Sequence, residues 1–319
     1  MASVSVALCT RDGERWIEEQ LLSILAQTTP VTEIVIGDDA STDATLEIIE
    51  RVAATTRIPI RVRRHDAPLG VAANFADTIA ATSGDVVALS DQDDVWHPDR
   101  IERLLPQLDG VALVHTDARL VDELGRPTMA TLERSLEMSR WERARLAEGR
   151  TFDALLRRNL VTGATVLVRR DFAVGALPVP AGWIHDEWLA ICAALADGVR
   201  YVPVTTIDYR QHGGNQIGVR RLGIRGKIDR LFEADSGKHA TKALRSESLA
   251  IEAERRGLGD ASQRALLAAK AEHERSRAQL PDARLARVPG VVRGVVAGRY
   301  RRFSRGLLDI GRDLLERHG

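Results

Sequence analysis

The chain has 319 residues, of which 44% are hydrophobic and 28% are charged, as is typical of a soluble globular protein. Lysine plus arginine and aspartate plus glutamate are equal at 45 each, which disfavours nucleic acid as a partner. The two cysteines, Cys9 and Cys192, lack metal-ligand spacing and fit a reduced cytoplasm. The start resembles no signal peptide and no run reaches the ~18 apolar residues of a membrane span, so we expect a cytoplasmic protein.

The first third of the chain alternates β-rich runs with segments of helical periodicity. The expected strands are residues 4–9, 33–36, 58–63 and 86–89, and the expected helices are residues 14–26, 43–54 and 72–81. Strands separated by single helices predict an α/β fold with a mainly parallel sheet and right-handed crossovers. Such a sheet binds its ligands at the carboxyl ends of its strands.

The middle of the chain continues this pattern less clearly. We expect a helix at residues 97–103, a strand at 109–121, a strand at 163–168, a helix at 186–196 and the last strands at 200–209. Residues 128–150 are charged and show no clear strand. Two interpretations of this segment stay open, a mobile lid and a helical insertion.

The composition changes beyond about residue 219, where Ala, Arg, Glu and Leu recur at about 3.6-residue spacing. Residues 291–318 are basic and amphipathic. We therefore predict one α/β domain at residues 1–218 and a helical C-terminal region at 219–319. The end of that region either lies on an anionic membrane surface or packs against the α/β domain or a second subunit.

An acidic cluster, Asp91-Gln92-Asp93-Asp94, follows the fourth predicted strand. Clustered carboxylates at this place fit Mg²⁺ or Mn²⁺, with phosphate oxygens filling the remaining positions. A solvated acidic turn before the next helix explains the same residues equally well. Asp38 and Asp39 follow the second strand, where Ser41 or Thr42 is expected to cap the next helix and Asp39 to accept bonds from a base or ribose.

Two further segments carry residues that suit catalysis. Asp186 opens a predicted helix beside Trp183 and Trp188, which suits a partly desolvated general base. A helix cap with both tryptophans in the core is the simpler interpretation. At the end of the last strand, Arg210 could meet a phosphate and neutral His212 could ligate a metal, although His212 could equally be an ordinary loop residue.

Taken together, three segments resemble the inverting family 2 glycosyltransferases: VSVALCTRDGERWIEEQLLSILAQTTPVTEIVIGDDAST (residues 4–42), LGVAANFADTIAATSGDVVALSDQDDVW (69–96) and YRQHGGN (209–215). The chain is most similar to the rhamnosyltransferase-type members that build bacterial surface polysaccharides. The resemblance covers about residues 3–218. It implies a GT-A fold and a metal-dependent enzyme that transfers a sugar from a nucleotide-diphosphate donor to a saccharide or lipid-linked acceptor. The expected donor is dTDP-L-rhamnose, with a UDP-hexose as the alternative.

The resemblance and the residue chemistry together assign roles to individual residues. The donor side is expected to comprise Thr10, Asp12, Glu14, Asp39, Gly70, Asn74, Asp91 and Arg210. The resemblance makes Asp91 and Asp93 a DxD motif for Mn²⁺ or Mg²⁺, with Asp94 beside it and His212 completing the coordination. Asp186 is the implied catalytic base, and the acceptor side is expected to comprise Thr162, Gly163, Trp183 and Glu187.

In the implied mechanism, Asp186 takes the proton of an acceptor hydroxyl while that oxygen attacks the anomeric carbon, and the diphosphate leaves from the opposite face. The chain departs from the family at Arg11 and Asp12, where an aromatic residue and Asn are usual, and at His185, where Glu is usual. The His-Asp pair is common in rhamnosyltransferase-like members. The rival functions are a sugar-phosphate nucleotidylyltransferase and an inactive scaffold. The acidic loop after the first strand argues against the first, and the intact carboxylates argue against the second. A homo-oligomer stays possible.

Overall fold

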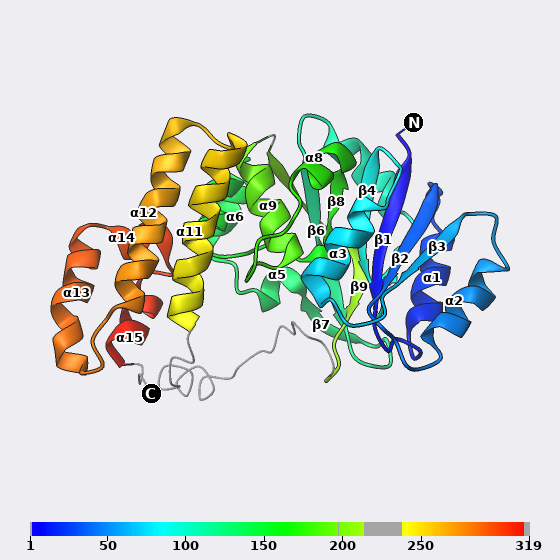
Figure 1. Ribbon diagram of the computed structural model, residues 1–319, viewed down its shortest axis with the longest axis horizontal. Helices are drawn as coiled ribbons and strands as arrows, with labels where there is room; N and C mark the ends of the chain where they lie inside the picture. Colours follow the sequence, from blue (N-terminus) through cyan, green and yellow to red (C-terminus); the bar gives the residue numbers. More distant parts are fainter. Residues whose placement is uncertain (1, 197, 214–237, 316–319) are drawn as a thin grey trace. The chain divides into compact units, whose positions relative to one another are not determined.

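The structure is a computed structural model that describes residues 2–196, 198–213 and 238–315 (Figure 1). It divides into two compact units, which are described separately. Unit 1 comprises Met1–Thr151, Leu160–Val179 and Trp183–Val219, and unit 2 comprises Phe152–Asn159, Pro180–Gly182 and Arg220–Gly319. The predicted boundary between residues 218 and 219 lies outside the described residues, as do Gly214 and Asn215 of the YRQHGGN segment.

Unit 1 is built on a mixed sheet. Its strands are β1 Val4–Thr10, β2 Glu33–Asp38, β3 Ile60–Arg64, β4 Val86–Asp91, β5 Val95–Trp96, β6 Leu113–Val121, β7 Pro127–Thr131, β8 Leu167–Arg169 and β9 Val199–Arg210. The described strands follow the order β3-β2-β1-β4-β8-β6-β9-β5, with β7 paired to β6. Strands β1 to β4 pair in parallel, as do β6 and β9, whereas β5, β7 and β8 pair antiparallel to their neighbours. The predicted α/β fold is confirmed, and its parallel pairing is concentrated in the first four strands.

The helices of this part of the chain connect the strands. They are α1 Ile17–Leu25, α2 Thr45–Ala53, α3 Val71–Ala80, α4 Arg100–Leu104, α5 Leu132–Ser135, α6 Arg140–Ala147, α8 Arg170–Gly175 and α9 His185–Leu195. Helix α7, Thr151–Leu155, belongs to unit 2 except for its first residue. The chain runs outward from β1 to β3 and then returns to β4 on the other side of β1. Right-handed crossovers therefore place α1 and α2 on one face of the sheet and α3 on the other. The packing agrees, because α1 contacts α2 while α3 contacts α8 and α9 (Figure 1).

The order in which strands are added reverses at β1, so that β2 and β4 flank it and the acidic segments come together. Cys9 of β1 is in register with Asp91 of β4, and Thr10 of β1 is in register with Asp38 of β2. Because these strands are parallel, the loops that follow them meet at the same edge of the sheet. Below that edge the strands carry fully buried apolar side chains, such as Leu8 and Ile36. The buried core thus fixes where the polar loops stand.

Three segments differ from the sequence-based expectations. Residues 128–150 form the helices α5 and α6, as the interpretation of a helical insertion expects, and also most of the short strand β7, which was not expected. Helix α6 begins with a capping box in which Ser139 and Glu142 bond each other's backbone N–H groups. Residues 163–168 begin with a 3₁₀ turn, Gly163–Thr165, so that only the end of this segment joins the sheet as β8. The last segment is one continuous strand, β9.

Unit 2 contains the helices α11 Lys238–Arg256, α12 Ala261–Ala278, α13 Arg284–Val296, α14 Arg299–Phe303 and α15 Leu307–Leu315. The predicted helical C-terminal region is confirmed. Arg277 of α12 donates to both oxygens of buried Asp313 on α15 over 2.7 Å, and the Tyr300 hydroxyl donates to the same carboxylate over 2.6 Å. Helices α12, α14 and α15 are thereby joined through one buried carboxylate. Within the described residues, every helix is too short or too polar to cross a membrane.

Candidate active site

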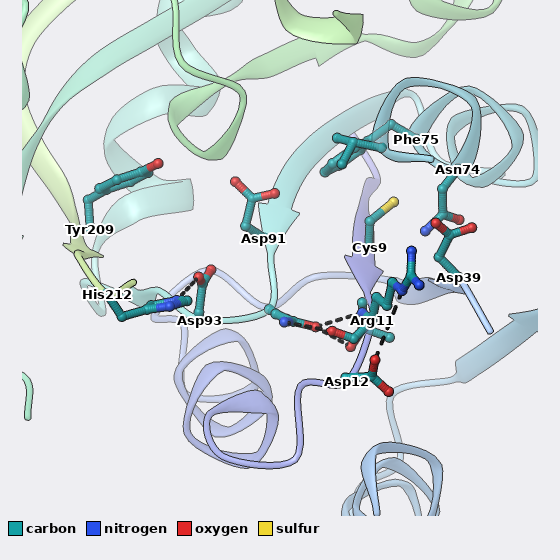
Figure 2. Close-up of a pocket in the computed structure, with 13 residues that line it drawn as sticks. Cys9, Arg11, Asp12, Asp39, Asn74, Phe75, Asp91, Asp93, Tyr209 and His212 are labelled. Carbon is teal, nitrogen blue, oxygen red and sulfur yellow. Dashed lines mark hydrogen bonds and ion pairs between the residues drawn. The ribbon is translucent and has the colours of Figure 1, made fainter. Parts of the chain in front are cut away.

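A pocket of about 260 Å³ lies at the carboxyl ends of β1, β2 and β4 (Figure 2). The loops after these strands, the first turns of α3 and the end of β9 supply its walls. The lining residues are Cys9, Thr10, Arg11, Asp12, Asp39, Val71, Asn74, Phe75, Asp91, Gln92, Asp93, Tyr209 and His212. Seven of the predicted site residues are therefore in one place: Thr10, Asp12, Asp39, Asn74, Asp91, Asp93 and His212.

The loop after β1 is tied to the loop after β2. Asp12, in the left-handed region at φ 47°, donates its N–H to the Ser41 hydroxyl over 2.9 Å. Its Oδ1 accepts the N–H of Thr42 over 2.8 Å. Ser41 and Thr42 thus hold the neighbouring loop and do not cap α2, contrary to the expected capping role.

Glu14 also differs from its predicted role on the donor side. Its carboxylate accepts the N–H of Ala44 over 3.1 Å, and its own N–H donates to Asp43 over 3.0 Å. Ala44 is the residue that immediately precedes α2. Glu14 does not line the pocket, because its carboxylate is turned to the start of that helix.

Asp39 fixes the loop that leads into α3. Its Oδ1 accepts the N–H of Leu69 over 2.6 Å, and its Oδ2 accepts the N–H of Gly70 over 3.0 Å. Gly70 precedes α3 with a φ of 85°, which favours glycine. Asp39 lines the pocket and at the same time sets the position of the loop at its rim. Gly70 contributes its backbone to this arrangement and does not line the pocket.

Asn74 is buried between α3 and β2. Its amide donates to the carbonyl of Gly37 over 2.9 Å. A Cβ atom at Gly37 would lie 2.3 Å from Asn74 Oδ1 and 2.1 Å from the Thr78 hydroxyl. The absence of a side chain at Gly37 therefore lets α3 approach the sheet closely enough for Asn74 to reach the pocket.

The acidic cluster after β4 places two carboxylates in the pocket. The Asp91 carboxylate accepts no hydrogen bond from the part of the chain that the structure describes, and it stands between Phe75 and Tyr209 in Figure 2. Burial raises the pKa of Asp91 to about 8, with further contributions from the charges of Asp93 and Asp186. Asp93 Oδ2 lies 2.7 Å from Nε2 of His212. A cation bound beside Asp91 would favour the ionised form of that carboxyl.

His212 is held from its other side by an aromatic ring. The ring of Trp16 stacks on it, with 4.1 Å between the ring centroids and an interplanar angle of 25°. Among the described residues, no three His, Cys, Asp or Glu side chains form a complete metal-binding cluster. Asp91, Asp93 and His212 could therefore supply only part of a coordination shell, as the sequence interpretation also expects.

Asp94 and Arg210 lie outside the pocket and have structural contacts, and the metal and phosphate roles expected for them stay predictions. Asp94 is buried, and its Oδ1 accepts the N–H of Arg210 over 3.0 Å. The guanidinium of Arg210 donates to the carbonyls of Asp93 over 2.8 Å and Glu123 over 3.2 Å, and to Glu19 over 2.7 Å. Both side chains are thus used to shape the turn that carries Asp93.

Asp186 begins α9, and both of its oxygens are engaged. Its Oδ2 accepts the N–H of Gly163 over 2.9 Å, and its Oδ1 accepts the N–H of Glu187 over 2.6 Å. Burial raises the pKa of Asp186 to about 6, although these hydrogen bonds lower it. Asp186 does not line the pocket itself, but it is close enough for its charge to raise the pKa of Asp91. It is therefore a carboxylate poised to take a proton near neutral pH.

His185, next to Asp186, is buried and stacks on Phe75 with 3.8 Å between the ring centroids. Burial lowers the pKa of His185 to about 3, so the ring is neutral. Neither ring nitrogen has a hydrogen-bond partner among the described residues. A Cβ at Gly163 would lie 2.8 Å from Nε2 of His185, so glycine is required there.

The remaining residues predicted on the acceptor side lie around Asp186. Trp183 and Trp188 are buried edge to face, with 5.4 Å between their ring centroids, as the simpler interpretation expects. Glu187 is half-buried beside Asp186. The carbonyl of Thr162 accepts the N–H and hydroxyl of Thr165, which closes the 3₁₀ turn. These predicted acceptor residues do not line the pocket.

The sequence of this site matches a known family. Residues 5–171, or 167 of the 319 residues, match the profile described as Glycosyl transferase family 2. The chain belongs to glycosyl transferase family 2. This assignment confirms the family resemblance and argues against the nucleotidylyltransferase alternative. The predicted GT-A fold is also confirmed: the mannosyltransferase of Pyrobaculum calidifontis, solved with GDP-Man and Mn²⁺, aligns with a TM-score of 0.55. The two are 20% identical, and the alignment covers 93% of this chain and 76% of that structure.

This family 2 chain also has curated relatives. An uncharacterized protein of Mycobacterium tuberculosis is 30% identical over 213 residues, which are 66% of this chain and 59% of the relative. The alignment thus spans less than two thirds of that relative's length. The dTDP-rhamnosyl transferase RfbG of Shigella flexneri is 27% identical over 236 residues, which are 70% of this chain and 78% of the relative.

The sequence interpretation missed several pocket residues of this family 2 site. Gln92 accepts the Thr10 hydroxyl over 2.6 Å and the Arg11 N–H over 2.8 Å, so it joins the β4 turn to the β1 loop. Phe75 and Cys9 line the pocket from α3 and β1. Phe75 follows Asn74 directly, and Cys9 is in register with Asp91. The position of each next to a predicted site residue was the signal by which Phe75 and Cys9 could have been found.

Proposed function

We propose that the chain transfers a sugar from a nucleotide-diphosphate donor to an acceptor hydroxyl with inversion at the anomeric carbon. The observation that carries this proposal is the carboxylate of Asp186. It is oriented by two backbone N–H groups, and burial raises its pKa to about 6. Its charge in turn helps to raise the pKa of Asp91 in the pocket. A base and a donor pocket thus lie next to each other.

In the proposed reaction, the acceptor oxygen forms a bond to the anomeric carbon while the bond from that carbon to the diphosphate breaks. The proton of the acceptor hydroxyl moves to Asp186, and the nucleoside diphosphate leaves with the bonding electron pair. The hydrogen bonds from Gly163 and Glu187 hold the carboxylate in one orientation. Asp186 therefore does not have to reorganise when the acceptor arrives.

The residues of the pocket fit a divalent cation, Mn²⁺ or Mg²⁺. Asp91 supplies a half-buried carboxylate that accepts no hydrogen bond within the described residues, and Asp93 supplies a second with His212 beside it. Hard oxygen ligands of this kind suit either ion, with donor oxygens completing the shell. When bound, the cation would neutralise charge on the diphosphate leaving group. The Mn²⁺ in the Pyrobaculum mannosyltransferase is consistent with this assignment.

We assign the donor to the side of the pocket formed by the loops after β1 and β2. Thr10, Asp12 and Asp39 line this side, and Asn74 closes it from α3. The acceptor is assigned to the side of Asp186, near Thr162, Gly163, Trp183 and Glu187. We propose L-rhamnose from dTDP-L-rhamnose as the donor sugar and bacterial surface polysaccharide, on a saccharide or lipid-linked acceptor, as the product. The similarity to the Shigella rhamnosyl transferase supports this choice.

Thermal unfolding with a set of nucleotide sugars in the presence of Mn²⁺ tests the proposal, because a ligand of the folded state raises its melting temperature. We expect dTDP-L-rhamnose to give a larger shift than UDP-glucose and to be hydrolysed slowly without an acceptor. A larger shift with a UDP-hexose would contradict the choice of sugar and leave the reaction in place. No shift with any nucleotide sugar would contradict the proposed function itself.

A further inference from the structure

Helix α13 carries a row of exposed apolar side chains. Leu285 is 88% exposed and Val296 is 83% exposed, and the valines at 288, 292 and 295 are also exposed. At helical spacing these five positions fall within an arc of about 100° on one side of the helix. Arg287 and Val291, which lie on another side, are buried within unit 2. The exposed row is thus separate from the packing face of α13.

Helix α15 reverses the usual distribution of polar and apolar residues. Its two aspartates are buried: Asp313 binds Arg277, and Asp309 accepts the N–H of Arg305 over 2.8 Å. Leu307 and Leu308 are 85% and 62% exposed. A surface helix ordinarily buries its leucines and exposes its charges. Burial of the aspartates anchors α15 and leaves its apolar side outward.

A stretch from the start of α13 to the start of α15 carries positive charge only. Residues 283–308 contain seven arginines and no acidic residue. Four of these arginines are exposed and make no ion pair in the described ranges: Arg284, Arg293, Arg301 and Arg302. On α13, Arg284 and Arg293 flank the apolar row at helical spacing. Apolar side chains bordered by unpaired arginines are the pattern of a helix that lies in an anionic lipid interface.

We propose that α13, α14 and α15 form a docking surface for an anionic lipid bilayer. The exposed leucines and valines enter the boundary between headgroups and acyl chains, while the arginines meet lipid phosphates. The unpaired positive charge of the surface favours an anionic bilayer over a second copy of the chain as its partner. Two copies of the surface would face each other with unpaired arginines on both sides, which is repulsive, whereas an anionic membrane neutralises them. The proposal concerns binding and does not depend on the proposed reaction.

Flotation of the full chain with vesicles tests the proposal. We compare phosphatidylcholine alone with an equimolar mixture of phosphatidylcholine and phosphatidylglycerol. We expect binding to the anionic vesicles, weakening with added salt, and little binding to the neutral ones. The double variant R301Q/R302Q should reduce binding to anionic vesicles by roughly tenfold or more. The double variant V296S/L307S should reduce it at all salt concentrations.

Matched controls come from unit 1, where Leu124 is 67% exposed and Arg57 is exposed. L124S and R57Q should bind vesicles like the parent, and all variants change exposed side chains, so they are expected to fold. Absence of binding to anionic vesicles would overturn the proposal, and so would binding that ignores lipid charge and the arginine substitutions. A dimer in light scattering that V296S/L307S dissociates, without vesicle binding, would assign the surface to a second copy instead.

Discussion

The backbone N–H of Gly163 donates to Oδ2 of Asp186 over 2.9 Å, which fixes the carboxylate at the start of α9. The backbone N–H of Glu187 donates to Oδ1, so backbone groups alone set the orientation of the Asp186 carboxylate. The carboxylate is nevertheless buried, and this burial outweighs the two hydrogen bonds in raising its pKa. The carboxylate of Asp186 thus has a fixed orientation and a raised affinity for protons.

Replacing Asp186 with Asn removes the proposed proton acceptor and keeps the shape of the side chain. We expect D186N to lower turnover by roughly 10²–10⁴-fold. Donor affinity should change little, because Asp186 does not line the pocket. Steady-state kinetics together with calorimetric donor titration measure the two quantities separately. Turnover within a few-fold of the parent would remove Asp186 from the mechanism.

Thermal unfolding provides the control for that variant. The pKa of Asp186 is raised from 3.8 to about 6 in the folded protein, so ionisation favours the unfolded state. The favourable contribution of the protonated form is present at low pH and is lost as the pH rises through about 6. D186N removes the buried charge, but its amide has one acceptor for the two backbone N–H groups, so its melting temperature should stay within a few degrees of the parent's at about pH 8. A large drop in its melting temperature would mean that lost activity reflects damage to the fold.

The same pKa predicts how activity depends on pH. The base works only when ionised, so turnover should fall by about tenfold for each pH unit below the pKa. Because burial raises that pKa to about 6, the acid limb should lie near pH 6 and not near the ordinary value of 3.8. A pH–rate profile at saturating substrates and cation measures this limb. A rate that stays constant down to about pH 5 would disagree with the assignment.

Adjacent aspartates should behave differently when the metal is removed or the side chains are truncated. Activity should disappear with EDTA and return with Mn²⁺ or Mg²⁺. D93A should abolish metal-dependent donor binding with a small change in melting temperature, and H212A should give a milder loss. D94A should instead cost about 1–3 kcal/mol of stability, because the buried N–H of Arg210 loses its partner. Isothermal titration with Mn²⁺ plus donor, and thermal unfolding, distinguish the two classes.

The chelator experiment has a definite contrary outcome. Unchanged activity in EDTA would show that Asp91 and Asp93 do not act through a cation. Equal loss of metal affinity in D93A and D94A would return Asp94 to the metal site that the sequence interpretation gave it.

His185 does not line the pocket, but its ring stacks on the pocket residue Phe75, so we expect the ring nitrogens to affect donor binding. The H185F variant keeps the stack on Phe75 and removes two nitrogens that have no partner in the described part of the chain. The variant should be at least as stable as the parent, while KM for the donor rises by roughly tenfold. H115F is the matched control, since burial also lowers the pKa of His115 to about 3 and its ring packs against Tyr201, which does not line the pocket. Unchanged kinetics in H185F would indicate a packing role only.

The sequence predicts which strand ends come together at the pocket, because local pattern and topology agree there. Apolar runs that end in acidic residues predict buried strands, and parallel strands bring those ends to one edge. The register of Cys9 with Asp91 and of Thr10 with Asp38 follows from this rule. These positions required no knowledge of long-range side-chain contacts.

Long-range contacts explain where the sequence interpretation was incomplete. Arg210 stands at a strand end like a phosphate ligand, but its partners Glu19 and Glu123 are distant in sequence and leave no local pattern. Asp93 and Asp94 are adjacent, and only the turn geometry decides that one lines the pocket and the other is buried. Strand β7 was not predicted for a similar reason, since its segment is mostly polar and becomes a strand through its pairing with β6.

The stack of Trp16 on His212 makes the proposed cation site optically observable. Indole emission responds to the group in van der Waals contact with its face, and here that group shares a hydrogen bond with Asp93. Any ligand that takes over the Asp93 carboxylate must release or redirect the imidazole beneath the indole. Trp16 can therefore act as an intrinsic fluorophore for occupancy of the site, without a label and without turnover, and W16F identifies its share of the signal.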